Sequence, residues 1–254
     1  PDLNPDYIVI ASHTALHHEQ LTFLEENLLG KKILVEKPLF DSSKDLRVKN
    51  NHVFVGYNLR FHPLLQRIKK IISGKNLWNI QVFCGSYLPD WRFGRDYRQT
   101  SSAKKETGGG VLLDLSHELD YVQWLAGTIS LEYVKSEKVS DLEIETDDLL
   151  LLSGKTVSDA HVHICLNYFS RRPTRQILID GEGFSIQADL ISNYLSVHEL
   201  NEQTEFSCSE VQRNDSYLAQ HNAVFGGDLS NICSYREGLE TMRLIDRIRL
   251  MSPL

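Results

Sequence analysis

The sequence is poor in cysteine, and its cysteines form no short-range pair. Cys84, Cys165, Cys208 and Cys233 are widely spaced and include no C-x-x-C motif. A chain of 254 residues can bury a core without disulfide staples, so free thiols in a reducing compartment are the simplest interpretation. We therefore expect a cytoplasmic protein without a disulfide framework.

Long apolar runs and long basic runs are also missing. No apolar stretch approaches the roughly 18 residues of a membrane span, and no segment has the pattern of a signal peptide. The formal net charge is -7, and the densest basic patches are only Arg171–Arg172 and Arg243–Arg249. We therefore expect neither a membrane nor a nucleic acid as a partner.

What is present is the composition of a globular protein, with 41% hydrophobic and 24% charged residues. This composition and length are typical of one large domain or two smaller ones. The first residue is Pro1 rather than methionine, so we expect a chain that begins after processing or truncation, or one whose start is not included in this sequence.

The first part of the chain alternates between strand-like and helix-like patterns. Residues 6–12 and 32–36 are short, β-branched apolar runs, which we interpret as strands buried on both faces, and 53–57 is a third strand. Leucines at helical spacing between the first two strands predict a helix, and residues 42–49 predict a short one. This alternation predicts βαβ units and a parallel sheet.

The pattern changes after Tyr57. Residues 63–73 predict an amphipathic helix, and residues 89–107 have no period and predict a long loop. Strand-like runs with turn signals between them predict a mostly antiparallel sheet, at residues 78–87, 131–139, 148–152, 160–168, 176–180, 183–188 and 194–200. Residues 217–224 and 235–251 look helical. We expect a domain of residues 1–57 and a second of residues 58–254, whose last helix packs back on the first.

Residues 108–127, GGGVLLDLSHELDYVQWLAG, carry the densest group of reactive side chains. On a helix, Leu115, Leu119, Val122 and Ala126 form an apolar stripe, and Asp114, His117, Glu118 and Tyr121 form a polar stripe that would face a cleft. Asp120 could hold one ring nitrogen of His117, and the three glycines would let the backbone approach a ligand closely.

Two interpretations of this helix remain open on residue types alone. One is a solvated face with a structural His–Asp contact. The other is an acid–base group, because a histidine near its reference pKa can take a proton from a hydroxyl. A metal site is disfavoured, because the HExxH arrangement is missing. His161, His163 and Cys165 alternate on one strand face, which favours a packed sheet face over a metal half-site.

The predicted loop combines aromatic and basic residues, namely Trp91, Arg92, Arg95, Tyr97 and Arg98. One interpretation is an ordinary exposed loop. The other is a lid over an anionic or sugar substrate, with arginine forks for carboxylate or phosphate and aromatic rings for a sugar.

Four ordered motifs together resemble the Gfo/Idh/MocA family of NAD(P)-dependent oxidoreductases. Glu36-Lys37-Pro38 is similar to the family's EKP signature, and residues 57–63, YNLRFHP, to its Y/F-N-x-R-F-x-P junction. The third motif is the segment of residues 108–127. The fourth, residues 236–241, REGLET, is similar to the late helix of most members.

The resemblance implies a role for individual residues. Lys37, Asp114 and His117 would be catalytic, with His117 as general base and Lys37 between the nicotinamide and the substrate. The residues expected beside the cofactor are Ser12, His13, Thr14, His17, Glu36, Lys37, Asn58 and Arg60. The residues expected to contact the substrate are Trp91, Arg92, Tyr97, Arg98, Glu118 and Tyr121.

Two features depart from the family pattern. Many members space the catalytic pair as D-x-x-x-H, whereas Asp114 and His117 are spaced as D-x-x-H. The family also begins with a strand, a G-x-G-x-x-G turn and a helix that holds the pyrophosphate, and this sequence has no such motif. We expect about 60–70 residues to be missing, as two βαβ units of about 30 residues each. A partial Rossmann-like sheet would then precede the second domain with its open-faced sheet.

The resemblance predicts an oxidoreductase that moves a hydride between NAD or NADP and a hydroxyl or keto group of a sugar or sugar nucleotide. The expected site contains no metal. The protein would form a homo-oligomer, a dimer or tetramer, through the open sheet face. The alternative is a truncated member that cannot use the cofactor and acts as an oligomerisation or binding module.

Overall fold

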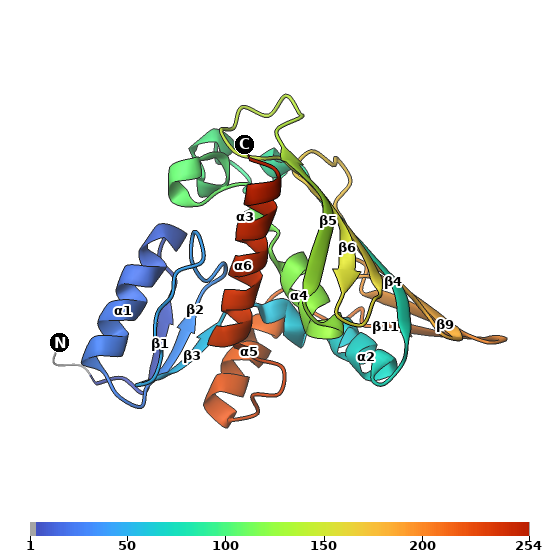
Figure 1. The fold of residues 1–254 in the computed structure, drawn as a ribbon, viewed down its shortest axis with the longest axis horizontal. Coiled ribbons are helices and arrows are strands. Elements are labelled where there is room, and N and C mark those ends of the chain that lie inside the picture. The colour runs from blue at the N-terminus through green and yellow to red at the C-terminus, as the bar shows by residue number, and fades with distance from the viewer. Residues whose placement is uncertain (1–3, 254) are drawn as a thin grey trace.

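A computed structural model describes residues 4–253 and contains two sheets (Figure 1). The smaller sheet has the order β1-β2-β3-β12. Its first three strands are parallel, and the short fourth strand is antiparallel to β3. These strands are β1 (Tyr7–Ile10), β2 (Lys32–Val35), β3 (His52–Val55) and β12 (Cys233–Ser234).

Helices cover both faces of the smaller sheet. Leu21 of α1 (His17–Asn27) packs into the same core as Ile10 and Ile33. On the other face, Leu34 and Phe54 cluster with Val224 of α5 (Asp215–Gly226). The prediction that residues 6–12 are buried on both faces was wrong. β1 is the edge strand of this sheet, and Val9 is 42% exposed.

The larger sheet has eight strands in the order β11-β10-β9-β8-β4-β7-β6-β5. Every neighbouring pair is antiparallel except β4 and β7, which run parallel. The strands are β4 (Leu77–Gly85), β5 (Ile129–Glu137), β6 (Leu149–Thr156), β7 (His161–Asn167), β8 (Thr174–Gly181), β9 (Phe184–Asp189), β10 (Tyr194–Glu199) and β11 (Glu202–Ser207). The predicted fold class, a parallel sheet followed by a large and mostly antiparallel open-faced sheet, is confirmed.

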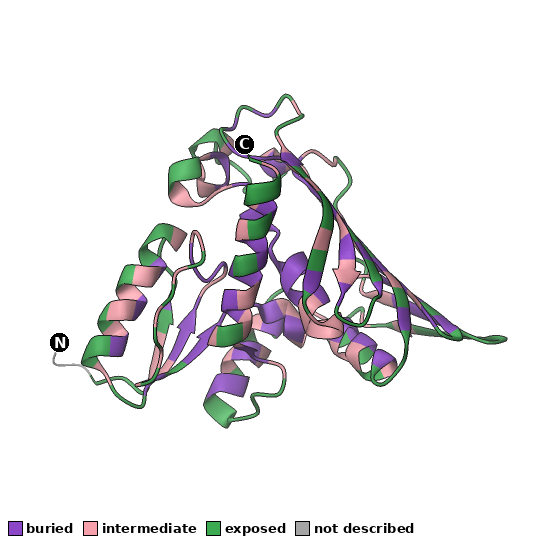
Figure 2. Cartoon of the chain, in the orientation of Figure 1, coloured by how far each residue is buried: buried purple, intermediate pink, exposed green. Residues whose placement is uncertain are grey.

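Alternation along the strands places one face of the larger sheet in the core and leaves the other exposed. Val162 and Ile164 of β7 are buried with the apolar residues of α2 (Pro63–Ile72) and α4 (His117–Ala126). His161 and His163, which alternate with these two residues along the strand, are exposed on the open face. Figure 2 shows the buried residues gathered between the sheets and along the helices there.

Helix α6 (Tyr235–Met251) runs between the two sheets (Figure 1). It begins with a capping box, in which Ser234 and Glu237 bond each other's backbone amides. Gly238 faces Val55 of β3 so closely that an added Cβ would come within 2.4 Å of that side chain. The last helix therefore packs directly on the smaller sheet, and only glycine fits at this contact.

Three local expectations differ from the structure. Residues 42–49 contain no helix, and β11 and β12 had not been predicted. The helix expected from Asp114 to Ala126 is two helices, α3 (Val111–Asp114) and α4, with a break at Leu115 and Ser116. Asp114 and His117 therefore belong to different helices and do not share one continuous helix face.

Candidate active site

Lys37 joins the two sheets at the candidate site. It lies two residues after the end of β2, and its Nζ atom donates a hydrogen bond of 2.7 Å to the backbone carbonyl of Asp114. Burial lowers the pKa of the Lys37 ammonium; the Asp114 carboxylate opposes this shift and the Arg175 guanidinium adds to it. The ammonium is thus a partly desolvated cation held by a neutral carbonyl.

Asp114 ends α3, and its carboxylate is held by a residue of the larger sheet. The hydroxyl of Tyr168 donates to Asp114 Oδ2 at 2.6 Å, and Tyr168 itself is fully buried just after β7. The Trp91 ring stands edge-on to the Tyr168 ring, with centroids 5.2 Å apart. Tyr168 therefore connects the predicted substrate loop with the predicted catalytic carboxylate.

His117 begins α4 and is only 8% exposed. Its Nδ1 atom is buried and has no hydrogen-bond partner within residues 4–253, while its ring stands edge-on to Tyr57. Burial lowers the pKa of His117 well below its ordinary value, and the charges of Lys37 and Arg175 lower it further. The imidazole is therefore neutral near pH 7, the form in which a ring nitrogen can accept a proton.

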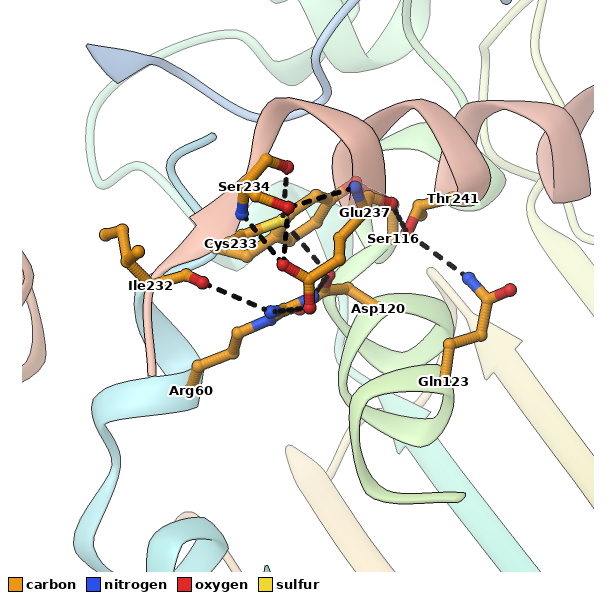
Figure 3. Close-up of polar contacts among 10 residues, drawn as sticks. Arg60, Ser116, Asp120, Gln123, Ile232, Cys233, Ser234, Glu237 and Thr241 are labelled. Carbon is orange, nitrogen blue, oxygen red and sulfur yellow. Dashed lines mark hydrogen bonds and ion pairs between the residues drawn. The ribbon is translucent and has the colours of Figure 1, made fainter. Parts of the chain in front are cut away.

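Asp120 does not hold His117, so that prediction was wrong. Its carboxylate instead receives two hydrogen bonds from Arg60, from Nε at 2.9 Å and from Nη2 at 2.8 Å. Arg60 also reaches Glu237 of α6 at 2.7 Å (Figure 3). The charged, bidentate guanidinium of Arg60 binds this carboxylate more strongly than the neutral imidazole of His117 would.

The same network changes the interpretation of Arg60, which the family resemblance placed near the cofactor. Arg60 is 2% exposed, and its guanidinium is taken up by Asp120, Glu237 and the carbonyl of Ile232 (Figure 3). In the structure it joins the junction segment to α4 and α6. Four of the five N–H donors of Arg60 are thus used within the protein.

Glu118 and Tyr121, expected to contact a substrate, are both 0% exposed. Glu118 accepts a hydrogen bond of 2.8 Å from Nε of Arg175, at the start of β8. The polar stripe therefore does not face an open cleft along its length. Glu118 and Tyr121 are therefore covered by protein. Arg175, which had not been predicted, is the cation that the larger sheet contributes here.

His17 fixes the segment that precedes α1. Its Nδ1 lies 3.1 Å from the carbonyl of Pro38, and its Nε2 lies 3.1 Å from the carbonyl of Ser12. Ser12 is exposed and bonds Gln20, and His13 is exposed beside it. His17 thus ties the Ser12–Thr14 turn to the residues that follow Lys37, so this group of predicted residues does lie together.

Glu36 and Asn58 lie at the carboxyl-terminal edge of the smaller sheet. Glu36 is half-buried, and burial raises the pKa of its carboxyl group. Asn58 is buried and donates to Ser216 of α5 at 2.7 Å. Glu36 therefore remains beside Lys37 as expected, whereas the Asn58 amide is engaged in holding α5.

The residues of the predicted substrate loop form short 3₁₀ turns and are tied to their surroundings. Trp91 donates to Ser86 at 2.8 Å, and the Tyr97 hydroxyl accepts from the backbone amide of Glu143 at 3.1 Å. Arg98 pairs with both Asp96 and Glu143. Arg92 is exposed. The Arg98 guanidinium is thus already occupied by carboxylates, in contrast to a free anion-binding fork.

Gly109 and Gly110, two of the three glycines, serve internal packing, which differs from the expected approach of a ligand. A Cβ on Gly109 would come within 2.1 Å of the Ser101 carbonyl oxygen, and one on Gly110 within 2.1 Å of Asp147 Oδ1. Asp147 holds the start of α3, since its Oδ2 accepts from the Leu112 amide at 2.9 Å. The glycines allow this close contact, which in turn sets the direction of the segment that carries Asp114.

Within residues 4–253, no group of three or more His, Cys, Asp or Glu side chains is placed to hold a metal ion. In the same part of the chain, no helix is long and apolar enough to cross a membrane. His163 of the open face bonds Ser153, and all four cysteines are free thiols.

The site therefore brings together an ammonium, a carboxylate and a neutral imidazole at the junction of the two sheets. Lys37 can stabilise negative charge on an oxygen, and His117 can accept or return a proton. Sequence reasoning missed Tyr168 and Arg175, because the strands that carry them lie more than fifty residues away along the chain. A tyrosine or arginine at a strand end gives no local signal of such a contact.

Comparison with known proteins gives a match in sequence to one family and one curated relative. Residues 65–187 match the model of the GFO/IDH/MocA C-terminal domain. An uncharacterized oxidoreductase of Streptococcus pneumoniae serotype 4 is 23% identical over 224 residues, which is 79% of this chain and 59% of the relative. The chain thus spans about three fifths of the length of this relative.

Solved structures share the fold. Levoglucosan dehydrogenase, in complex with NADH and levoglucosan, superposes with a TM-score of 0.82 at 17% identity, over 97% of this chain and 78% of that one. The WlbA dehydrogenase from Bordetella pertussis, in complex with NADH and UDP-GlcNAcA, gives a TM-score of 0.73 at 20% identity, over 99% and 78%. The match of residues 65–187 to the GFO/IDH/MocA C-terminal domain confirms the resemblance predicted from the sequence.

Proposed function

We propose that the protein is an oxidoreductase that moves a hydride between a nicotinamide cofactor and a hydroxyl or keto group of a sugar or sugar nucleotide. The single observation that carries the proposal is the contact of Lys37 Nζ with the Asp114 carbonyl. It holds the ammonium close enough to the neutral His117 for the charge of Lys37 to lower the pKa of that imidazole. Relatives with this fold include levoglucosan dehydrogenase bound to NADH and WlbA bound to NADH and UDP-GlcNAcA.

The reacting hydroxyl would lose its proton to His117 and its developing negative charge would be offset by Lys37. The buried Nδ1 of His117, which has no partner within the described residues, fits this role. Lys37 keeps donor capacity, because an ammonium has three N–H groups and one is used by the Asp114 carbonyl.

A nicotinamide cofactor, when bound, supplies or accepts the hydride. The residues that would hold it are Glu36 and Lys37 at the edge of the smaller sheet, and the Ser12–Thr14 turn beside them. The half-buried Glu36 and the exposed Ser12 and His13 fit a ligand that runs along this edge. The proposal covers NAD and NADP alike. Arg60 and Asn58 are engaged elsewhere and have no part in this proposal.

The test is hydride transfer followed by nicotinamide absorbance across a panel of sugars and nucleotide sugars. We expect His117→Ala to lower kcat by about 100-fold or more, with Gln123→Ala, whose side chain bonds Thr241 of α6, to control for disturbance of α4. Unchanged turnover of His117→Ala with every substrate that the wild type uses would refute the assignment of the base.

A second candidate function is favoured by the exposed face of the larger sheet. Phe83 (36%), Tyr133 (52%) and Leu178 (38%) are exposed there, and with their neighbours they line a depression of about 400 Å³. We propose this face as the contact between copies in a dimer or tetramer. A binding module without hydride chemistry would keep this assembly but show no NADH binding in a fluorescence titration.

Sedimentation measures the assembly directly. We expect Tyr133→Asp to convert the oligomer to monomers, because burying a carboxylate in an apolar contact is costly. An unchanged sedimentation coefficient would place the interface elsewhere.

The cytoplasmic location stays a prediction from the sequence.

A further inference from the structure

A second cavity lies at the edge of the larger sheet, beside the candidate active site. It measures about 400 Å³ and is lined by Tyr87, Tyr97, Phe169, Arg171 and the Val139–Leu142 segment. We call it the rim cavity. Because β4 and β7 are parallel, the residues that follow both strands meet at this edge, and the segment after β5 joins them. Its volume lies in the range of small-molecule sites.

The Arg171 guanidinium in the rim cavity is available to a ligand. It stacks on the Tyr87 ring with its central carbon 3.5 Å from the ring centroid. None of the ion pairs within residues 4–253 involves Arg171, whereas nearby Arg98 is held by Asp96 and Glu143. A guanidinium that is pre-oriented on an aromatic ring and has its donors free suits a phosphate or carboxylate.

The other lining groups suit the remaining parts of a nucleotide. Tyr97 and Phe169 add two half-buried aromatic rings, which can pack against a planar base. Asp141 is exposed at the cavity and can accept hydrogen bonds from a ribose diol. A bare anion would be repelled by Asp141, so the combination favours a ligand that has a ring, hydroxyl groups and an anionic group together.

The walls of the rim cavity are fixed before any ligand binds. The carboxylate of Asp148 accepts from the backbone amides of Val139 at 2.8 Å and Ser140 at 3.0 Å. The Tyr97 hydroxyl accepts from the Glu143 amide. A pre-formed site loses less conformational entropy on binding than a flexible one.

The rim cavity is also connected to the candidate active site. Phe169 directly follows Tyr168, and Tyr168 donates to Asp114 at 2.6 Å. The backbone amide of Leu88, next to Tyr87, bonds the Tyr168 carbonyl at 2.8 Å. One side of this short segment thus lines the cavity while its Tyr168 side chain holds the predicted catalytic carboxylate.

We propose that the rim cavity binds the nucleoside diphosphate part of a nucleotide-sugar substrate, with Arg171 on the phosphates. The proposal rests on the proposed function, because it places the sugar at Lys37, Asp114 and His117. It narrows the substrate class from sugars in general to sugars that carry a nucleoside diphosphate.

The experiment titrates uridine 5′-diphosphate into the full chain by calorimetry, without cofactor. We expect saturable binding that weakens about tenfold or more in Arg171→Ala. Uridine alone and inorganic pyrophosphate alone should each bind about tenfold or more weakly than uridine 5′-diphosphate, because each lacks one half of the recognised group. Arg171→Lys should recover only part of the affinity, since lysine keeps the charge but not the planar stacking.

Arg172→Ala is the matched control, because Arg172 is the exposed neighbour that does not line the cavity. Equal weakening in Arg171→Ala and Arg172→Ala would show charge attraction without a site and would overturn the proposal. So would the absence of binding heat with the wild type at millimolar nucleotide. Circular dichroism of each variant shows whether it is folded, and Phe169→Ala tests the same cavity through a second residue.

The two proposals fail separately. Hydride transfer to a free sugar without any binding of uridine 5′-diphosphate would refute the rim cavity as a nucleotide site and leave the proposed function standing. Nucleotide binding that depends on Arg171, in a protein without hydride transfer to any sugar or nucleotide sugar, would refute the proposed function and leave the rim cavity as a nucleotide site.

Discussion

Lys37 and Asp114 meet through a side chain and a backbone carbonyl, at 2.7 Å, rather than through their two charges. The position of the ammonium is therefore set by the path of the chain at the end of α3. The Asp114 carboxylate is left to Tyr168, so the two residues of the site are anchored independently of each other.

This arrangement predicts different effects for substitutions at the two positions. We expect Lys37→Met to lower kcat for hydride transfer by about 100-fold or more, because the developing charge loses its counter-charge. Asp114→Asn should leave the Lys37 contact in place and lower kcat less, since the backbone carbonyl remains. Steady-state kinetics on both variants measures this, and an equal loss in the two would show that Lys37 depends on the carboxylate.

Tyr168→Phe removes the hydroxyl that holds Asp114 in a buried setting. We expect a loss of about 1.5–3 kcal/mol in the free energy of unfolding, the usual range for a hydrogen bond to a charged group. Urea unfolding measures it, with Tyr133→Phe on the exposed sheet face as the control. A change no larger than that of the control would mean that the contact contributes nothing to stability.

Substitutions of the buried Arg60–Asp120 pair should have large and non-additive effects on the free energy of unfolding. Arg60→Met should lower this free energy by about 3–5 kcal/mol, because it leaves the Asp120 carboxylate buried without its partner. The double variant Arg60→Met/Asp120→Leu should recover much of that loss, while Arg243→Met on exposed α6 should cost less than about 1 kcal/mol. Additive losses in the double variant would contradict the pairing.

Asp147 predicts a specific pH dependence. Burial raises the pKa of its carboxyl group to about 6. Between pH 4 and 6 the native state therefore holds a proton that the unfolded chain has released, so this group's stabilising contribution is full below about pH 4 and is lost as the pH rises through 6. Over this range the raised pKa of Asp147 lowers the free energy of unfolding by about 3 kcal/mol.

Unfolding curves of Asp147→Asn across pH 4–7 test this expectation. The variant keeps an oxygen for the Leu112 amide, but it has no charge to bury. We expect its stability relative to the wild type to rise with pH over this range. A constant difference between the two proteins from pH 4 to 7 would show that Asp147 has an ordinary pKa in the native state.

The lowered pKa of His117 predicts the opposite dependence of stability on pH. Because burial lowers its pKa, the unfolded chain takes up a proton near pH 6.5 that native His117 does not, and stability should fall as the pH decreases through that value. In NMR spectra of the imidazole, we expect the neutral form of His117 to persist below pH 6.5. An imidazolium signal from His117 at pH 6.5 would contradict the burial of an unpaired ring.

Several parts of the fold follow from local patterns alone. The parallel strands β2 and β3 were predicted because continuous β-branched runs are typical of buried parallel strands. The alternating strands around His161–Cys165 were predicted because one face of that sheet is open. Helix α6 was found over its full length from apolar spacing. In each case the pattern repeats over enough residues to be recognised without knowing the partner.

The site was predicted less completely. Lys37, Asp114 and His117 were identified by resemblance, and the structure places them at one junction. The partner of Asp120 was misassigned, because helical spacing brings His117 near it but cannot show that Arg60, sixty residues earlier, is buried against the same carboxylate. Glu118 was assigned to a cleft for a similar reason, since spacing defines a stripe without showing what covers it.

By itself, the sequence determined most of the segments that form strands and helices, and which residues carry charge or reactive groups, because these depend on side chains close together in the chain. Only the tertiary structure decided which of those groups are available. Arg60, Arg98 and Glu118 are engaged by partners from distant segments, while Arg171 stacks on Tyr87 and forms no ion pair within residues 4–253. The physical reason is that burial and pairing depend on where separate strands and helices meet, and that is a property of the packed chain.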